Sequence, residues 1–223
     1  MSFHPMIPRA VLFDFDGVIA DTENVHVVAW QRTLVRMGWR MTDEVAARAS
    51  EVDDRAWLAD VFASKSIENG DLDGWCRMKQ ELTVEILSES PYVYPGVVEL
   101  VRSLEGKTRL AVVTTTWRAN VEAVLKAAKL TEAFELIVAK EDVSAVKPDP
   151  EAYKLALTKL RLKPEQAVAI EDSPGGIASA VGAGIQVLAV GHRRPTGDWH
   201  AGASGFVDAL SGSAAIRELL EKA

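Results

Sequence analysis

The stretch that decides the fold is Ala10-Val11-Leu12-Phe13-Asp14-Phe15-Asp16-Gly17, an apolar run that stops abruptly at two acidic residues and a glycine. A short run of apolar, β-branched and aromatic residues that is closed by glycine is typical of a buried strand. Asp14 and Asp16 would then stand at the carboxyl end of this strand. If the extended conformation continues, their side chains leave the same face.

Short apolar runs and helical patterns alternate along the second half of the chain. The predicted strands are residues 110–113, 136–138, 167–170, 187–190 and 206–207. The predicted helices are residues 97–104, residues 119–129, one that begins at Asp149-Pro150-Glu151 with Asp149 as its N-cap, and one that begins at Ser173-Pro174. This alternation indicates an α/β core, a doubly wound and mainly parallel sheet with helices on both faces.

The segment that follows the first predicted strand has another pattern. Over residues 21–90 the apolar residues recur at helical spacing, enough for three or four helices. We therefore expect a small helical cap over residues 19–91, inserted into an α/β core that is formed by residues 1–18 and 92–223.

Composition narrows the class of protein. The 223 residues carry a formal net charge of -7, which disfavours nucleic acid as a partner because such binders usually have a basic face. No run reaches the roughly 20 apolar residues that a membrane helix needs, and no signal peptide is visible. The single cysteine, Cys76, excludes an intrachain disulfide and suits a reducing compartment. We expect a cytoplasmic protein with no membrane partner.

Polar and charged residues stand where the predicted strands end. They are Asp14 and Asp16 after the first strand, Thr114 after the second, Lys147 after the third, and Glu171 with Asp172 after the fourth. In open parallel sheets, ligands bind beyond the carboxyl ends of the strands. Taken singly, each residue has a plainer explanation, such as a solvated acid, a strand-closing threonine or an exposed lysine. Their joint occurrence favours one functional site.

The acidic members of this set favour a divalent cation. Two carboxylates held close together repel each other, and an ion beside them relieves that repulsion. Mg²⁺ prefers hard oxygen ligands and is often held by one or two carboxylates together with a substrate phosphate. We therefore predict Mg²⁺ at this edge of the sheet and a small phosphorylated substrate.

Asp14-x-Asp16-Gly17-Val18, Thr114, Lys147-Pro148 and Glu171-Asp172-Ser173 together resemble the four signature motifs of the haloacid dehalogenase superfamily. The resemblance spans residues 11 to about 207. The insert resembles the small helical cap of the branch that contains β-phosphoglucomutase and phosphoglycolate-type phosphatases. Asp21-Thr22-Glu23 and Tyr94-Pro95-Gly96 are further local matches to the β-phosphoglucomutase-like group.

The resemblance implies a role for each position. Asp14 would attack phosphorus and form an aspartyl-phosphate, and Asp16 would act as general acid and then as general base. Thr114 and Lys147 would hold the phosphoryl oxygens, with Thr115 as a further substrate contact. The implied Mg²⁺ ligands are Asp14, the backbone carbonyl of Asp16, Glu171 and Asp172. This cap type is compatible with a monomer.

The cap should select the substrate. Its candidate substrate-binding residues are His26, Trp30, Arg55, Arg77 and Lys79. Each also has a structural explanation: a half-buried polar residue, a core tryptophan or a solvated basic face. The mutase grips a distal phosphate with a Gly-Val-Ser-Arg segment, and this chain has acids over residues 49–55, with Arg55 displaced. A phosphatase is therefore favoured over a phosphomutase, which remains the alternative.

Three other classes fit the motifs less well. A haloalkanoate dehalogenase lacks the second aspartate, which is Asp16 here. A phospho-accepting receiver domain has its acidic pair earlier in the chain and no helical insert. A non-catalytic phosphate-binding protein would be expected to have lost one of the key side chains, and all of them are present.

Overall fold

The computed structural model describes residues 8–40, 42, 53–67, 70–193 and 197–211. The chain divides into two compact units, Met1–Asp21 with Tyr92–Ala223, and Thr22–Pro91. We call them the core unit and the helical unit. The first boundary between the two units follows Asp21, because Ala20 pairs with both Asp16 and Val93 and so belongs to the core unit.

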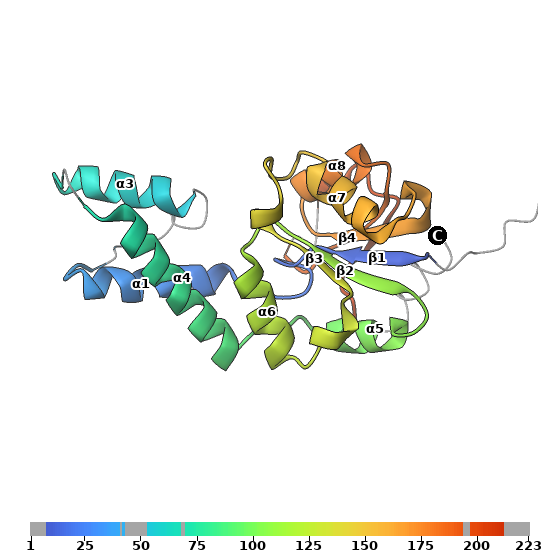
Figure 1. Cartoon of the computed structure of the whole chain (residues 1–223), viewed down its shortest axis with the longest axis horizontal. Helices are drawn as coiled ribbons and strands as arrows, with labels where there is room; N and C mark the ends of the chain where they lie inside the picture. The colour runs from blue at the N-terminus through green and yellow to red at the C-terminus, as the bar shows by residue number, and fades with distance from the viewer. Residues whose placement is uncertain (1–7, 41, 43–52, 68–69, 194–196, 212–223) are drawn as a thin grey trace, which may run out of the picture. The chain divides into compact units, whose positions relative to one another are not determined.

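The core unit contains one sheet of parallel strands (Figure 1). Its order is β3-β2-β1-β4-β5-β6, with β1 and β4 in the middle. The strands are β1 (Ala10–Phe13), β2 (Arg109–Val113), β3 (Leu136–Val138), β4 (Ala167–Glu171), β5 (Gln186–Val190) and β6 (Gly205–Val207). Every adjacent pair is parallel, which confirms the predicted α/β class.

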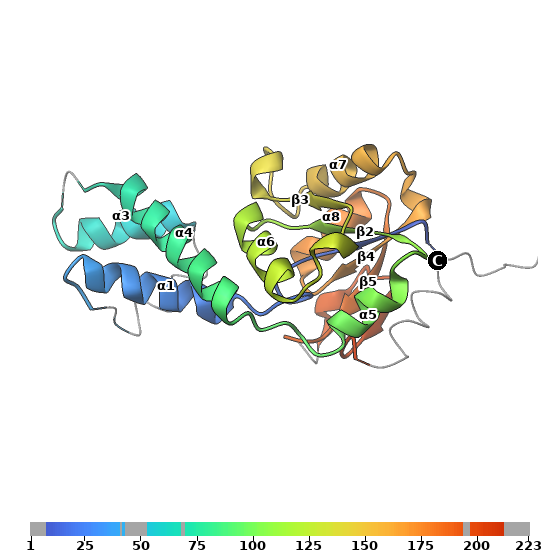
Figure 2. The same ribbon diagram turned by 60° about the horizontal axis from the view of Figure 1, so that its bottom comes forward.

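Helices cover both faces of this sheet (Figures 1 and 2). They are α5 (Val97–Leu104), α6 (Arg118–Ala127), α7 (Glu151–Leu160) and α8 (Pro174–Gly182), joined by the short 3₁₀ turns η1 (Thr131–Ala133), η2 (Lys140–Asp142), η3 (Pro164–Gln166) and η4 (Asp198–His200). The residues of β1 are completely buried, and alternate side chains serve opposite faces. Ala10 and Leu12 join the apolar cluster that includes Tyr153 of α7 and Ile177 of α8.

Two helix starts fix loops at the carboxyl edge of the sheet. Ser173 caps α8, because its hydroxyl accepts a hydrogen bond from the amide of Gly176 at 3.0 Å, and Pro174 is the first helical residue as predicted. Helix α7 begins one residue later than expected. Pro150 occupies the cap position, and Asp149 accepts from the amide of Glu151 at 2.9 Å.

The helical unit contains α1 (Glu23–Arg36), α3 (Asp54–Ser64) and α4 (Leu72–Glu89). Trp30 of α1 and Trp57 of α3 are both buried, with ring centroids 4.4 Å apart. Leu34, Leu58, Val61 and Phe62 complete this apolar cluster. Over the described residues, no helix combines the length and the apolar character that a bilayer crossing requires.

Candidate active site

Three acidic side chains meet at the carboxyl edge of the central strands. Asp14 follows β1, Glu171 ends β4, and Asp172 comes next in the chain. All three are buried, and each offers a carboxylate oxygen that lies within 4.8 Å of the other two. The adjacency of β1 and β4 brings them together, because Phe13 is in register with Ile170. The amide of Asp14 donates to the carbonyl of Ile170 at 3.0 Å, which fixes the start of the loop.

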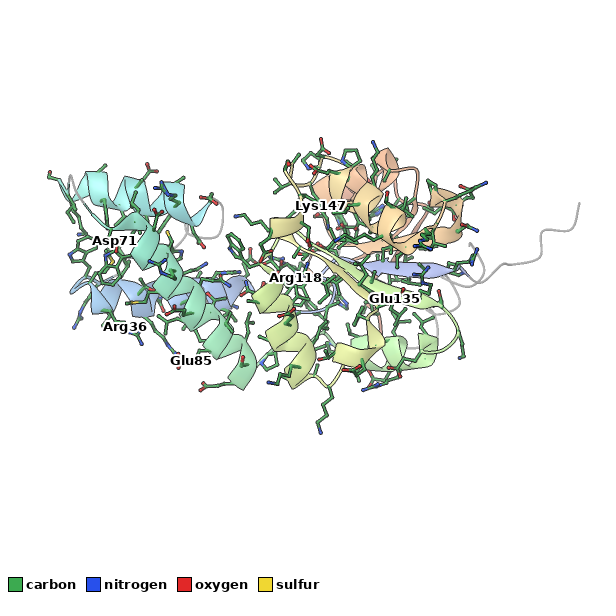
Figure 3. All side chains as sticks on the ribbon, viewed as in Figure 1. Arg36, Asp71, Glu85, Arg118, Glu135 and Lys147 are labelled. Atoms are coloured by element: carbon green, nitrogen blue, oxygen red, sulfur yellow. The ribbon has the colours of Figure 1, made fainter. Side chains whose placement is uncertain are left out.

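Lys147 binds this acidic group directly. Its ammonium donates to Asp14 Oδ1 at 2.6 Å, to Glu171 Oε1 at 2.7 Å and to the carbonyl oxygen of Val113 at 2.8 Å. All three donors of the ammonium therefore have an acceptor. Figure 3 labels Lys147, which reaches the end of the sheet from the loop that precedes α7.

Burial and charge shift the protonation equilibria of this group. Burial, and next the charge of Asp14, raise the pKa of Glu171 to about 8, although Lys147 and the hydroxyl of Tyr153 act in the opposite direction. Burial disfavours the ammonium of Lys147, but Asp14 and Glu171 outweigh it and raise the pKa of Lys147 above its ordinary value. Asp14 and Glu171 share the single ammonium of Lys147, and the carboxylate of Asp172 lies close to both, so a bound cation would favour the ionised form of all three acids.

The surroundings of the carboxylates fit a small cation. Among the described residues, Glu171 Oε2 is buried and accepts no hydrogen bond. A Cβ at Gly176 would lie 1.9 Å from Glu171 Oε2, and one at Gly17 would lie 2.0 Å from Asp172 Oδ2. Gly17 also has a positive φ of 87°. The backbone therefore comes close to both carboxylates. Their oxygens are the hard ligand atoms that Mg²⁺ prefers.

Thr114 lies beside this group on the neighbouring strand end. It is buried directly after β2, and its Oγ1 accepts from the amide of Thr116 at 3.1 Å. Asn120 of α6 donates in turn to Thr116 Oγ1 at 3.2 Å. Thr115 lies half-buried within the same loop. This network fixes the loop next to Asp14, since β1 and β2 pair directly.

Asp16 is half-buried in a tight turn rather than in a continued strand. The amides of Val18, Ile19 and Ala20 all point to the carbonyl of Phe15, which bends the chain directly after β1. The extended continuation that would place Asp14 and Asp16 on one face is therefore wrong. The structure does not place Asp16 among the three side chains that could ligate a metal, and its roles remain predictions.

In the helical unit, three predicted residues meet in one partly buried polar cluster. The ammonium of Lys79 donates to Asp54 Oδ2 at 2.8 Å and Oδ1 at 3.0 Å, and lies 2.8 Å from His26 Nδ1. Trp30 Nε1 donates to Asp54 Oδ1 at 2.9 Å. Burial, and then Lys79, lower the pKa of His26 to about 4. These contacts explain the three residues structurally, and their substrate contacts remain predictions.

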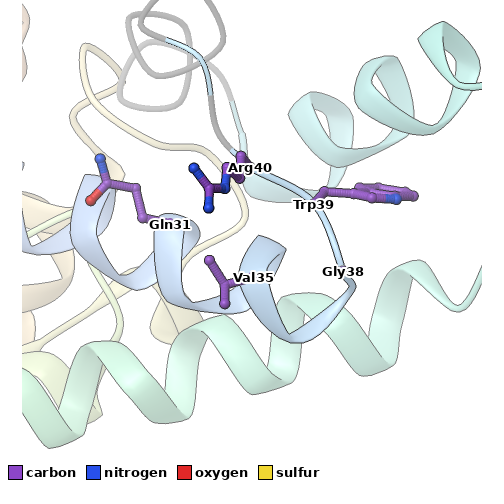
Figure 4. A pocket seen from close by; sticks show the side chains of 5 residues that line it. All are labelled: Gln31, Val35, Gly38, Trp39 and Arg40. Atoms are coloured by element: carbon purple, nitrogen blue, oxygen red, sulfur yellow. The ribbon is translucent and has the colours of Figure 1, made fainter.

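The two predicted arginines lie elsewhere in the helical unit. Arg55 is exposed and pairs with Asp73 at 2.9 Å, and Arg77 is exposed on α4. Residues 49–55 were compared above with the phosphate-binding Gly-Val-Ser-Arg segment of the mutase. Of these, residues 49–52 lie outside the described residues. A surface hollow of this unit is lined by Gln31, Val35, Gly38, Trp39 and Arg40 and includes none of the predicted residues (Figure 4).

Sequence reasoning missed several residues that complete these clusters. Tyr153, within the predicted helix that begins near Asp149, donates to Glu171 Oε1 at 2.6 Å. Asp54 is one acid among several in the insert. Arg193 lies 3.9 Å from Asp172 Oδ2 and follows β5 by a few residues, so its position after a strand end was the available signal.

The chain has relatives of known family. Residues 11–190 match the family described as haloacid dehalogenase-like hydrolase. The chain is 34% identical to protein CbbY of Rhodobacter capsulatus, over 95% of this chain and 98% of that protein. It is 32% identical to a phosphorylated carbohydrates phosphatase of Thermotoga maritima, over 80% and 82% of the two chains.

A solved structure has the same fold. It is a Thermotoga maritima protein provisionally named β-phosphoglucomutase, with 30% identity and a TM-score of 0.81, and the match covers 95% of this chain and all of that one.

Proposed function

This chain belongs to the haloacid dehalogenase-like hydrolase family and is a phosphoric monoester hydrolase, and on that premise we propose that it is a Mg²⁺-dependent phosphatase of small phosphorylated sugars or similar metabolites. The observation that carries the proposal is the group formed by Asp14, Glu171, Asp172 and Lys147 at the carboxyl edge of the sheet. A relative named as a phosphatase of phosphorylated carbohydrates supports the substrate class.

Asp14 is the nucleophile of this proposal. Its carboxylate attacks phosphorus and forms an aspartyl-phosphate, which water then hydrolyses. Lys147 holds Oδ1 of this carboxylate through a charge-assisted bond of 2.6 Å, so the attacking group is oriented before the substrate arrives. The same ammonium offsets the negative charge that develops on the phosphoryl oxygens.

Asp14, Glu171 and Asp172 would hold Mg²⁺, with the carbonyl oxygen of Asp16 as a further ligand. The bound cation would neutralise the repulsion between the attacking carboxylate and the phosphate. Thr114 and Thr115 contact the phosphoryl group or the substrate beside it. Asp16 protonates the leaving oxygen and then takes a proton from water, a double role that a half-buried carboxyl group next to Asp14 can perform.

The experiment is a phosphate-release screen of the purified protein across a metabolite panel with Mg²⁺. We predict turnover that EDTA abolishes and that Asp14→Asn lowers at least about 1,000-fold, because the amide cannot attack phosphorus. Asp208→Asn is the matched control, since Asp208 is an exposed acid of the same unit. Unchanged turnover in Asp14→Asn would refute the nucleophile assignment.

A phosphomutase remains the second candidate, and the solved Thermotoga maritima protein provisionally named β-phosphoglucomutase favours it. The screen separates the two functions. A hexose 1-phosphate with a trace of the bisphosphate gives the 6-phosphate under a mutase, but only inorganic phosphate under the phosphatase proposed here.

A further inference from the structure

Trp117 is an exposed aromatic residue next to the proposed catalytic threonine. It follows Thr114 by three positions, at the end of the β2 loop, and 37% of its surface is exposed. The other five tryptophans are all buried or half-buried. A partly exposed aromatic ring on a loop at the carboxyl edge of the sheet is accessible to a ligand that binds at this edge.

Hydrogen bonds of the neighbouring residues fix the backbone on either side of Trp117. The amide of Lys140 donates to the carbonyl of Thr116 at 2.9 Å, which joins the β2 loop to the η2 turn. The amide of Arg118 donates to the carboxylate of Glu141 at 3.1 and 3.2 Å. Arg118 also donates to the carbonyl of Ile137 at 3.1 Å, and Figure 3 labels this residue at the start of α6. The loop that carries the indole is therefore held in place by contacts within the core unit itself.

A cation accompanies the ring. The ammonium of Lys140 lies 5.0 Å from the centroid of the Trp117 ring, within the range of a cation–π contact. Both residues come from loops at the carboxyl ends of neighbouring strands, β2 and β3. Trp117 and Lys140 thus present an apolar face beside a hydrogen-bond donor, and Trp117 lies in the same loop as Thr114.

This pairing suits the non-reacting part of a sugar phosphate. A sugar ring has a face of C–H groups that can cover an indole, and hydroxyl or anionic oxygens at its edge that accept from an ammonium. A short acyclic anion such as phosphoglycolate has no apolar face to offer. Binding sites that combine an aromatic surface with a few placed polar groups fix the orientation of such ligands.

We infer that Trp117 and Lys140 select ring-form sugar phosphates by contacting the sugar that leaves, an inference that rests on the proposed phosphatase function. Contacts made away from phosphorus can be used in the transition state, so they raise the rate as well as the affinity. The substrate class is thereby narrowed from small phosphorylated metabolites to cyclic sugars.

The test measures kcat/KM for a hexose 6-phosphate and for glycerol 3-phosphate, and takes the ratio of the two. Wild type should prefer the hexose. Trp117→Ala should lower the ratio at least about 10-fold, and Trp117→Phe should restore most of it because a ring remains. Lys140→Met should raise KM for the hexose. Val98→Ala, an equally exposed apolar residue on α5, is the control that keeps the ratio.

The outcomes separate the two proposals. A wild type that hydrolyses no phosphate ester overturns the phosphatase function and the inference with it. A phosphatase whose ratio is the same in wild type and Trp117→Ala, or whose wild type prefers glycerol 3-phosphate, overturns the inference alone. Circular dichroism of each variant shows whether its fold is intact.

Discussion

At the scale of residues, the site depends on how one lysine holds two acidic side chains. Lys147 is bound by Asp14, Glu171 and the Val113 carbonyl, and little of its side chain is exposed. In such a place, removing one partner leaves the others buried and uncompensated, which costs far more than the pair itself contributes. Lys147 therefore serves both stability and the orientation of the proposed nucleophile.

Replacing Lys147 by Met should have two effects. In EDTA, the free energy of unfolding should fall by about 3–5 kcal/mol, because Asp14 and Glu171 lose their cation. Turnover with Mg²⁺ should fall at least about 100-fold. Urea unfolding measures the change in stability and phosphate release measures the change in turnover. Lys163→Met, at an exposed lysine, is the control. A variant with wild-type stability and rate would contradict both roles.

At the scale of elements, the helices of the helical unit are joined by polar contacts as well as by apolar packing. His26 and Trp30 belong to α1, Asp54 to α3 and Lys79 to α4, so one partly buried cluster joins three helices. A partly buried network of this kind is costly when a member changes its charge, because the low local dielectric strengthens each interaction.

Acid should weaken this cluster through His26. Its pKa is lowered to about 4 in the fold, against 6.5 in the unfolded chain, so the unfolded state binds the proton more readily between these values. Stability that is present above pH 6.5 is therefore lost as the pH falls toward 4, by up to about 3 kcal/mol.

The measurement is urea unfolding of wild type and His26→Gln at several pH values. The difference in unfolding free energy between the two proteins should change across this window. A constant difference from pH 7 to pH 4 would show that His26 does not carry the effect.

The elements also show what the sequence could predict. Apolar runs and turn residues predicted every strand of the core to within a residue or so, since burial on both faces leaves a continuous apolar pattern. The sequence analysis did not predict the bend after Phe13, in which several amides share the carbonyl of Phe15, although the Asp16-Gly17 pair is a turn signal. The Asp54 cluster was also not predicted, since an acid at a helix start has a simpler explanation.

At the scale of the whole molecule, the order of the strands gathers distant residues. Asp14, Thr114, Lys147 and Glu171 come from four separate parts of the chain, yet the order β3-β2-β1-β4 places their loops next to one another. Joint occurrence in the sequence predicted this convergence. The individual contacts, such as Lys147 bridging Asp14 and Glu171, are visible only in the three-dimensional structure.

The direct test of this convergence is a calorimetric titration with Mg²⁺. We predict one Mg²⁺ per chain for wild type and for Asp208→Asn. Asp14→Asn and Asp172→Asn should each weaken binding at least about 10-fold, although these two positions are far apart in the sequence. Wild-type affinity in both variants, or no Mg²⁺ binding by the intact protein, would contradict the account.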